Sequence, residues 1–206
     1  MNNMDTTELT ISYYNQNVEQ FIQETGNVDF SAVQEAFLQY IPDGGLILDL
    51  GCGSGRDSKV FLDKGYRIVA VDGSEEMCKA ASKYIGESVI YSLFQNYQPI
   101  ERFDGIWACA SLLHLQEQDI IPIIRKLSDA LRNDGAFYMS FKYGIKAEIR
   151  SGRYYTDFTE ETLENLIHQI PGLSVVKMWF TQDVRTDNNT KWLNILCLKN
   201  VSVDYD

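Results

Sequence analysis

Residues 46–56 read LILDLGCGSGR. In this stretch an apolar run that contains Asp49 leads into three glycines at alternate positions, Gly51, Gly53 and Gly55. A short apolar run that ends at glycines is typical of a buried strand in a parallel sheet. Because glycine has no Cβ, the backbone can turn sharply there and approach a ligand closely. The stretch therefore predicts a strand, a ligand-binding loop and then a helix.

Strand-like and helix-like segments alternate from residue 46 to residue 142. This alternation is typical of an α/β fold, in which a parallel sheet carries helices on both faces. Right-handed crossovers then bring the C-terminal ends of the strands, and any ligand, to one edge. Pro122 is expected in the first turn of its helix, where a missing N–H is tolerated. The expected strands are 46–50, 67–72, 88–94, 103–110 and 136–142, and the expected helices are 55–64, 74–85 and 119–131.

The two ends of the chain differ from this alternating middle. Residues 1–42 carry apolar side chains at helical spacing, and Gly26 is expected to divide them into two helices. After a further helix over 160–170, LSVVKMWFTQDV and KWLNILCLK are joined by the polar segment RTDNNT, which predicts an antiparallel hairpin. No repeat or linker interrupts the chain, so we expect one domain over 1–206, with the N-terminal helices covering the ligand edge.

Charge and composition restrict the partners. The net charge is −11, which disfavours nucleic acid and membrane surfaces because both are anionic. The four cysteines form no C-x-x-C pair and there are only two histidines, so we expect no metal site. Scattered cysteines, no signal-peptide pattern and no apolar run long enough to span a bilayer together predict a reduced, cytoplasmic protein.

The glycine loop does not have the spacing of a dinucleotide site. The pattern G-x-G-x-x-G started at Gly51 would need a third glycine where Arg56 stands. Asp72 does lie at the end of the second strand, where an acid could hold a ribose. However, Asp49 and Asp57 flank the loop, and their carboxylates would repel a pyrophosphate while favouring a cationic ligand.

These residues carry a family resemblance. LDLGCGSGR, the VD at the end of the second strand and FDGIWACASLLHL together resemble class I S-adenosylmethionine-dependent methyltransferases, over about residues 10–200. GCGSGR, RYY at 153–155 and Asp183-Val184 further resemble the tellurite-resistance-type methyltransferases. The resemblance implies a Rossmann-like, seven-stranded, mostly parallel sheet whose last strand is antiparallel, in agreement with the expected C-terminal hairpin.

The resemblance also implies roles for individual residues around S-adenosylmethionine. It places the cofactor's methionine part on the backbone of the glycine loop and the ribose hydroxyls on Asp72. Asp49 would orient the loop or the cofactor's ammonium group. Many family members hold the adenine amine with an aspartate near position 94 or 95, where this chain has Phe94 and Gln95. The implied cofactor-binding residues are Tyr14, Asp49, Gly51, Cys52, Gly53, Asp72, Gly73, Met77, Phe94, Gln95 and Cys109.

Several of these residues have a plainer interpretation. Met77 could be core filling on the apolar face of a helix, and Tyr14 could pack on the sheet rather than over the cofactor. His114 follows the fourth strand, where a general base could reach a substrate, but it could equally be a satisfied, partly buried side chain. Cys52 and Cys109 have no evident base beside them, so neither is expected to act as a nucleophile.

The segment FKYGIKAEIRSGRYY is basic and aromatic in an otherwise acidic chain. It follows the fifth strand, so it should lie over the ligand edge, although it could also be a solvated loop that pairs with acids elsewhere. Arg153, together with Arg185 in the expected hairpin turn, is the candidate for holding an anionic acceptor. With His114, these arginines are the candidate catalytic and substrate-positioning residues.

The sequence thus predicts methyl transfer from S-adenosylmethionine to a small-molecule acceptor that is anionic or polar. Two alternatives remain open at this point. One is a nicotinamide-dependent oxidoreductase, which the glycine spacing and the acids beside the loop disfavour. The other is a non-catalytic module that binds S-adenosylmethionine, which would need the same loop.

Overall fold

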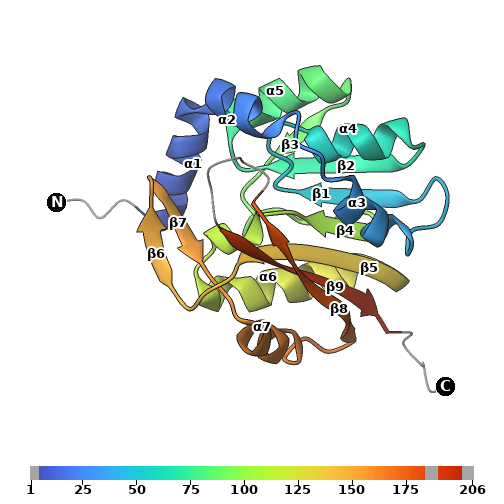
Figure 1. The fold of residues 1–206 in the computed structure, drawn as a ribbon. Helices are drawn as coiled ribbons and strands as arrows, with labels where there is room; N and C mark the ends of the chain where they lie inside the picture. Colours follow the sequence, from blue (N-terminus) through green and yellow to red (C-terminus); the bar gives the residue numbers. More distant parts are fainter. Residues whose placement is uncertain (1–4, 184–189, 201–206) are drawn as a thin grey trace.

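The computed structural model describes residues 5–183 and 190–200. Its main feature is a seven-stranded sheet in the order β3-β2-β1-β4-β5-β9-β8 (Figure 1). The pairs that β9 forms with β5 and β8 are antiparallel and the other four pairs of this sheet are parallel, so the prediction of a mostly parallel, Rossmann-like sheet with an antiparallel C-terminal hairpin is confirmed. The strands are β1 (Leu46–Leu50), β2 (Arg67–Asp72), β3 (Val89–Tyr91), β4 (Phe103–Ala108), β5 (Leu131–Lys142), β8 (Leu173–Gln182) and β9 (Lys191–Lys199).

Helices cover both faces of this sheet, and the side chains of β1 show how. Ile47 points into a cluster with Phe37 and Phe61, which come from the helices on one face. Leu48 and Leu50 point the opposite way, into the larger cluster beneath the helices of the other face. The helices flanking the sheet are α3 (Ser31–Leu38), α4 (Arg56–Asp63), α5 (Glu75–Ile85), α6 (Glu117–Ala130) and α7 (Glu160–Ile167).

The N-terminal segment forms three helices rather than the expected two. Besides α3 there are α1 (Thr6–Gln16) and α2 (Val18–Thr25), which are separated at Asn17. The Asn17 side chain donates a hydrogen bond to the Tyr13 carbonyl at 2.7 Å, and such a local bond competes with helix continuation. The short helices let α1 contact both α5 and β7, so that it passes over the C-terminal edge of the sheet (Figure 1).

Two further expectations need correction. Helix α6 begins at Glu117, so Pro122 lies in its second turn and not its first. Glu117 and Asp119 favour the earlier start because acids stabilise a helix N-terminus, and Pro122 then removes only the bond to the carbonyl of residue 118, which is exposed to water. The third strand is also shorter than residues 88–94, because the chain turns after Tyr91.

The basic segment after β5 is not a loop. It forms a separate two-stranded antiparallel sheet of β6 (Ala147–Arg150) and β7 (Arg153–Thr156), which lies beside α1 (Figure 1). The Tyr154 backbone N–H donates to the Thr10 hydroxyl at 3.1 Å, which ties β7 to α1. Residues that are distant in sequence thus form one wall at the edge of the main sheet.

Within the described residues, no helix is long and apolar enough to cross a membrane. All four cysteines are free. The same residues contain no group of three or more His, Cys, Asp or Glu side chains that could hold a metal ion.

Candidate active site

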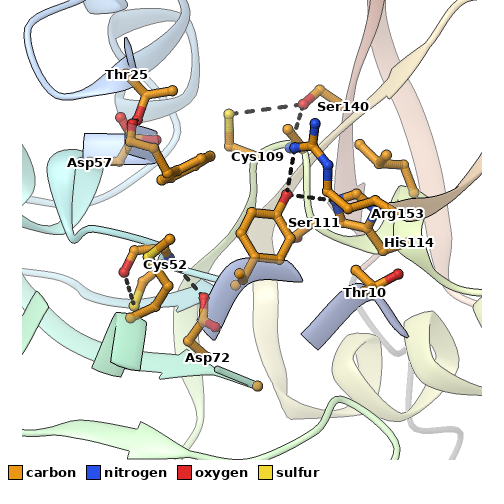
Figure 2. Close-up of a pocket in the computed structure, with 18 of the residues that line it drawn as sticks. Thr10, Thr25, Cys52, Asp57, Asp72, Cys109, Ser111, His114, Ser140 and Arg153 are labelled. Atoms are coloured by element: carbon orange, nitrogen blue, oxygen red, sulfur yellow. Dashed lines mark hydrogen bonds between the residues drawn. The ribbon is translucent and has the colours of Figure 1, made fainter. Parts of the chain in front are cut away.

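One large pocket lies at the C-terminal edge of the sheet, and most of the predicted site residues line it. They come from β1 and the glycine loop after it, the end of β2, the start of α5, the segment after β3, the segment after β4, β7 and α1. In Figure 2, Asp72 and Cys52 lie at one end of the pocket, and Ser140, His114 and Arg153 lie at the other. The predicted residues that line it are Tyr14, Asp49, Gly51, Cys52, Gly53, Asp72, Gly73, Met77, Phe94, Gln95, Cys109, His114 and Arg153.

Arg185 cannot be placed, because it lies outside the described residues. Its role in binding the acceptor stays a prediction.

The glycine loop needs glycine for two separate reasons. Gly51 and Gly53 have φ angles of +77° and +55°, a backbone conformation that side chains with a Cβ rarely adopt. In addition, a Cβ on Gly51 would lie 2.4 Å from the Cβ of Ser111, which no ordinary packing allows. The loop therefore brings bare backbone to the pocket, as the sequence predicts.

Asp72 ties this loop to the end of β2. Its carboxylate accepts hydrogen bonds from the backbone N–H of Gly53 and of Ser74, both at 2.8 Å. Burial raises the pKa of Asp72, while these backbone bonds oppose that shift. Each carboxylate oxygen can accept a further bond from a ligand hydroxyl at the pocket surface.

Asp49 and Asp57 differ sharply in their environments. The negative charge of Asp57 is balanced by Arg56, which pairs with both of its oxygens at 2.8–2.9 Å. The Trp107 indole also donates a hydrogen bond to Asp57 at 2.9 Å. This pairing corrects the expectation that Asp57 would repel an anionic ligand. Asp49 accepts a bond from Ser58 at 2.6 Å, and burial, together with the charge of Asp57, raises the pKa of Asp49 to about 7.

The segment that follows β3 is held by a residue that the sequence did not single out. The Lys126 ammonium on α6 donates to the backbone carbonyls of Phe94 at 3.0 Å and Gln95 at 3.2 Å. These bonds fix the chain where the family's usual acidic residue is missing. Met77 is buried at 1% exposure and also borders the pocket, so the structure is compatible with both of its interpretations.

Ser111 is a second residue that sequence reasoning missed. It is buried beside Gly51 at the end of β4, and its hydroxyl has no hydrogen-bond partner among the described residues. A buried hydroxyl without a partner is costly, so one on the wall of a pocket indicates a polar group of a ligand. A serine that follows a strand is too common a pattern to have shown this from sequence.

Cys109 and Cys52 both line the pocket but lack activation. Burial raises the pKa of the Cys109 thiol to about 12, and it raises that of Cys52 as well. A raised pKa disfavours the thiolate near neutral pH, so burial does not activate either thiol as a nucleophile.

The other end of the pocket carries cations and aromatic rings. The Arg153 guanidinium lies 4.3 Å from the ring centre of Tyr13 and 5.5 Å from that of Tyr155. No salt bridge joins Arg153 to an acid in the described part of the chain, and its buried Nε has no hydrogen-bond partner there. Arg150, by contrast, forms a bidentate pair with Asp157. Arg153 is therefore the arginine of this hairpin with charge available to a ligand.

A known domain matches the part of the chain that builds the glycine loop and the first half of the sheet. The family model described as "Methyltransferase domain" matches residues 47–135. Residues 47–135 are therefore similar to a methyltransferase domain. The resemblance to class I methyltransferases is confirmed by this match and by the fold.

One relative matches a longer stretch of this chain than residues 47–135. YqeM of Bacillus subtilis (strain 168) is 30% identical over 129 residues, which is 59% of this chain and 52% of that protein. This chain therefore spans about half the length of that relative.

Solved structures share the fold over nearly the whole chain. The 1,6-didemethyltoxoflavin-N1-methyltransferase of Burkholderia thailandensis has a TM-score of 0.72 at 22% identity, covering 92% of this chain and 85% of that one. A TehB-like methyltransferase of Corynebacterium glutamicum ATCC 13032 has a TM-score of 0.68 at 20% identity, covering 92% and 98%. Methyltransferases similar to the tellurite-resistance type are thus among the proteins that share this architecture.

Proposed function

We propose that this protein transfers a methyl group from S-adenosylmethionine to a small acceptor that is anionic or strongly polar, and that it acts in the cytoplasm. The observation that carries the proposal is the cradle at the sheet edge, where Asp72 holds the backbone of Gly53 beside the bare loop at Gly51. When bound, S-adenosylmethionine supplies an electrophilic methyl group on a positively charged sulfur.

The residues present fit this cofactor. Asp72 has free acceptor capacity for ribose hydroxyls, and the buried Ser111 hydroxyl offers a partner for a polar group next to the glycine loop. The Asp49 carboxylate suits a ligand that carries positive charge. Gly73, Met77, Phe94 and Gln95 form the part of the pocket proposed for the adenine.

The chain's contribution to catalysis is mainly positioning. Holding an acceptor in line with a reactive methyl group can account for much of the barrier reduction without a general base. Helix α1 and strand β7 contact each other beside the pocket, and a wall that kept water from the acceptor would make its reacting atom more nucleophilic. An already ionised acceptor would need no proton removal at all.

The proposed acceptor class rests on charge at the far end of the pocket. Arg153 and Lys142 both line that end, and Asp183 is an acid that also lines it. Asp183 accepts a hydrogen bond from the Trp192 indole at 3.2 Å, which partly satisfies its carboxylate. The uncompensated guanidinium of Arg153 favours an acceptor with a carboxylate-like or phosphate-like group. The Burkholderia enzyme named above was solved with the small molecule 1,6-didemethyltoxoflavin, which supports an acceptor of modest size.

The first prediction tests the cofactor. We expect S-adenosylmethionine and S-adenosylhomocysteine to bind in the micromolar range, while NAD and NADP give no measurable heat. The reason is the glycine spacing and the buried Asp49, which suit a cation and not a pyrophosphate. Isothermal titration calorimetry on the purified chain measures all four. Tight nicotinamide binding without heat from S-adenosylmethionine would support the oxidoreductase alternative instead.

A turnover assay distinguishes the proposed enzyme from the alternative, a non-catalytic module that binds S-adenosylmethionine. Protein that binds S-adenosylmethionine should move a radiolabelled methyl group into the small-molecule fraction of a cell extract. Cofactor binding without such transfer would favour the module.

The second prediction concerns pH. The pKa of Asp49 is raised to about 7, so the carboxylate is largely protonated at about pH 6 and largely ionised at about pH 8. Because a cationic cofactor prefers the ionised form, its affinity should rise up to about 10-fold over this range. Calorimetry at several pH values measures the rise, and Asp49→Asn should flatten it. A pH-independent affinity in the unchanged protein would contradict the role of Asp49.

The same group acts on stability with the opposite sign. The folded apoprotein keeps a proton on Asp49 up to about pH 7, whereas the ordinary pKa is 3.8. This contribution to the free energy of unfolding is fully present below the ordinary pKa and is lost as the pH rises through about 7. The apoprotein should therefore lose stability between about pH 4 and pH 7, which thermal melts of the apoprotein across this range measure.

A further inference from the structure

Tyr14, His114 and the backbone of β7 form a hydrogen-bonded chain beside the acceptor end of the pocket. The Tyr14 hydroxyl oxygen lies 2.9 Å from Nε2 of His114. The other ring nitrogen, Nδ1, lies 2.7 Å from the carbonyl oxygen of Tyr154. Tyr14 and His114 both line the pocket, and the two rings meet edge to face at 5.6 Å.

The Tyr154 carbonyl determines which atom donates in each of these two hydrogen bonds. A carbonyl oxygen can only accept, so Nδ1 of His114 must carry the proton, and Nε2 of the neutral ring must accept. Tyr14 is then the donor to Nε2, which uses the single proton of its hydroxyl. The Tyr14 oxygen is left with lone pairs only.

Arg153 shares this oxygen from the other side. Its Nη1 lies 3.5 Å from the Tyr14 oxygen in a long hydrogen bond, with the guanidinium 5.6 Å from the centre of the Tyr14 ring. Figure 2 shows Arg153 and His114 at the same end of the pocket. The site thus pairs a guanidinium, which donates, with a phenolic oxygen that can only accept.

His114 is held in its neutral form by its surroundings. Burial lowers the pKa of His114 to about 3, and the nearby charges of Arg153, Lys142 and Arg150 act in the same direction. With both ring nitrogens occupied, His114 fixes the orientation of Tyr14 and has no free position for a proton from the acceptor.

We propose that the Tyr14 oxygen accepts a hydrogen bond from the reacting O–H, N–H or S–H group of the methyl acceptor, while Arg153 holds an anionic group of the same molecule. The proton displaced from the reacting atom would leave to bulk water with the methylated product, because both ring nitrogens of His114 are occupied. This inference rests on the proposed function and narrows the acceptor class: the acceptor carries a hydrogen-bond donor close to its negative charge. His114 is a positioning residue, because it acts on the acceptor only through Tyr14.

The third prediction concerns the direction of the hydrogen bonds at His114, which NMR on protein labelled with ¹⁵N-histidine can test. With only His114 and His168 present, the spectrum is simple, and the exposed His168 is an internal reference. We expect His114 to be the Nδ1–H tautomer throughout about pH 5–8, since its pKa is about 3. Tyr14→Phe should shift the Nε2 resonance, and Tyr84→Phe, which removes an exposed hydroxyl from α5, should not. An Nε2–H tautomer would overturn the proposal.

Small carboxylates test the binding step itself, with the protein saturated by S-adenosylhomocysteine. Acetate carries only the charge, glycolate adds a hydroxyl donor, and methoxyacetate keeps the oxygen without the donor. We expect glycolate to bind about 5-fold more tightly than methoxyacetate, the scale of one neutral hydrogen bond. The Nε2 resonance of His114 reports the binding. Tyr14→Phe should abolish this preference, and Tyr84→Phe should preserve it.

The outcomes separate this inference from the proposed function. If S-adenosylhomocysteine does not bind, the proposed function itself is wrong. If it binds but glycolate and methoxyacetate bind equally, or neither binds, the role of Tyr14 is refuted while the cofactor site stands. Persistence of the glycolate preference in Tyr14→Phe would refute it as well.

Discussion

Asp72→Ala will bind S-adenosylmethionine about 100-fold more weakly than the unchanged protein, the scale of one or two charge-assisted hydrogen bonds lost from one site. The substitution removes the proposed partner of the ribose hydroxyls. It also removes the bonds to the backbone N–H of Gly53 and Ser74, each 2.8 Å long, which hold the glycine loop against the start of α5. Both the contact and the preorganisation of the loop are lost together.

Calorimetry with S-adenosylmethionine and S-adenosylhomocysteine measures this loss. Asp63→Ala is the matched control, because it removes the same charge from an exposed position on α4, where Asp63 pairs with Lys59. The control should bind like the unchanged protein. If Asp72→Ala melts normally and keeps full affinity, Asp72 does not hold the ribose.

Arg153→Ala should lower methyl transfer about 30-fold while leaving cofactor affinity nearly unchanged. The estimate follows from removing one charge-assisted interaction with the acceptor, worth about 1.5–3 kcal/mol. Cofactor affinity should persist because Arg153 lies at the end of the pocket opposite Asp72 (Figure 2). Arg153→Lys keeps the charge but not the planar fork that stacks on Tyr13, so we expect only partial recovery.

Transfer of a labelled methyl group into small-molecule extracts measures the effect, and calorimetry checks the cofactor. Arg132→Ala is the control, since Arg132 pairs with Asp104 at the start of β5, at the edge of the sheet away from the pocket. Unchanged turnover in Arg153→Ala would mean that the guanidinium only packs on the tyrosine rings, and the anionic-acceptor proposal would then be abandoned.

Features encoded in neighbouring residues could be predicted from the sequence. The alternation of apolar runs and helical patterns is sufficient to specify the parallel sheet, because the period of side-chain burial differs between strands and helices. The glycine loop directly follows β1, and Asp72 is the last residue of β2. The right-handed crossover rule brings the C-terminal ends of both strands to one edge of the sheet. Helix boundaries do not follow from periodicity in this way, because the break at Asn17 depends on one side-chain hydrogen bond to the Tyr13 carbonyl.

How the site residues act on one another depends on contacts between distant parts of the chain. Tyr14 and His114 are 100 positions apart and Tyr14 and Arg153 are 139 apart, so no local pattern relates them, yet their contacts set which atom is the donor. In the same way, the fold packs Ser111 against Gly51. It also pairs Asp57 with Arg56, whereas the buried Asp49 has a raised pKa. Spacing along a chain specifies backbone conformation, which is a local property. Partnership, burial and pKa depend on which distant side chains the folded sheet brings together.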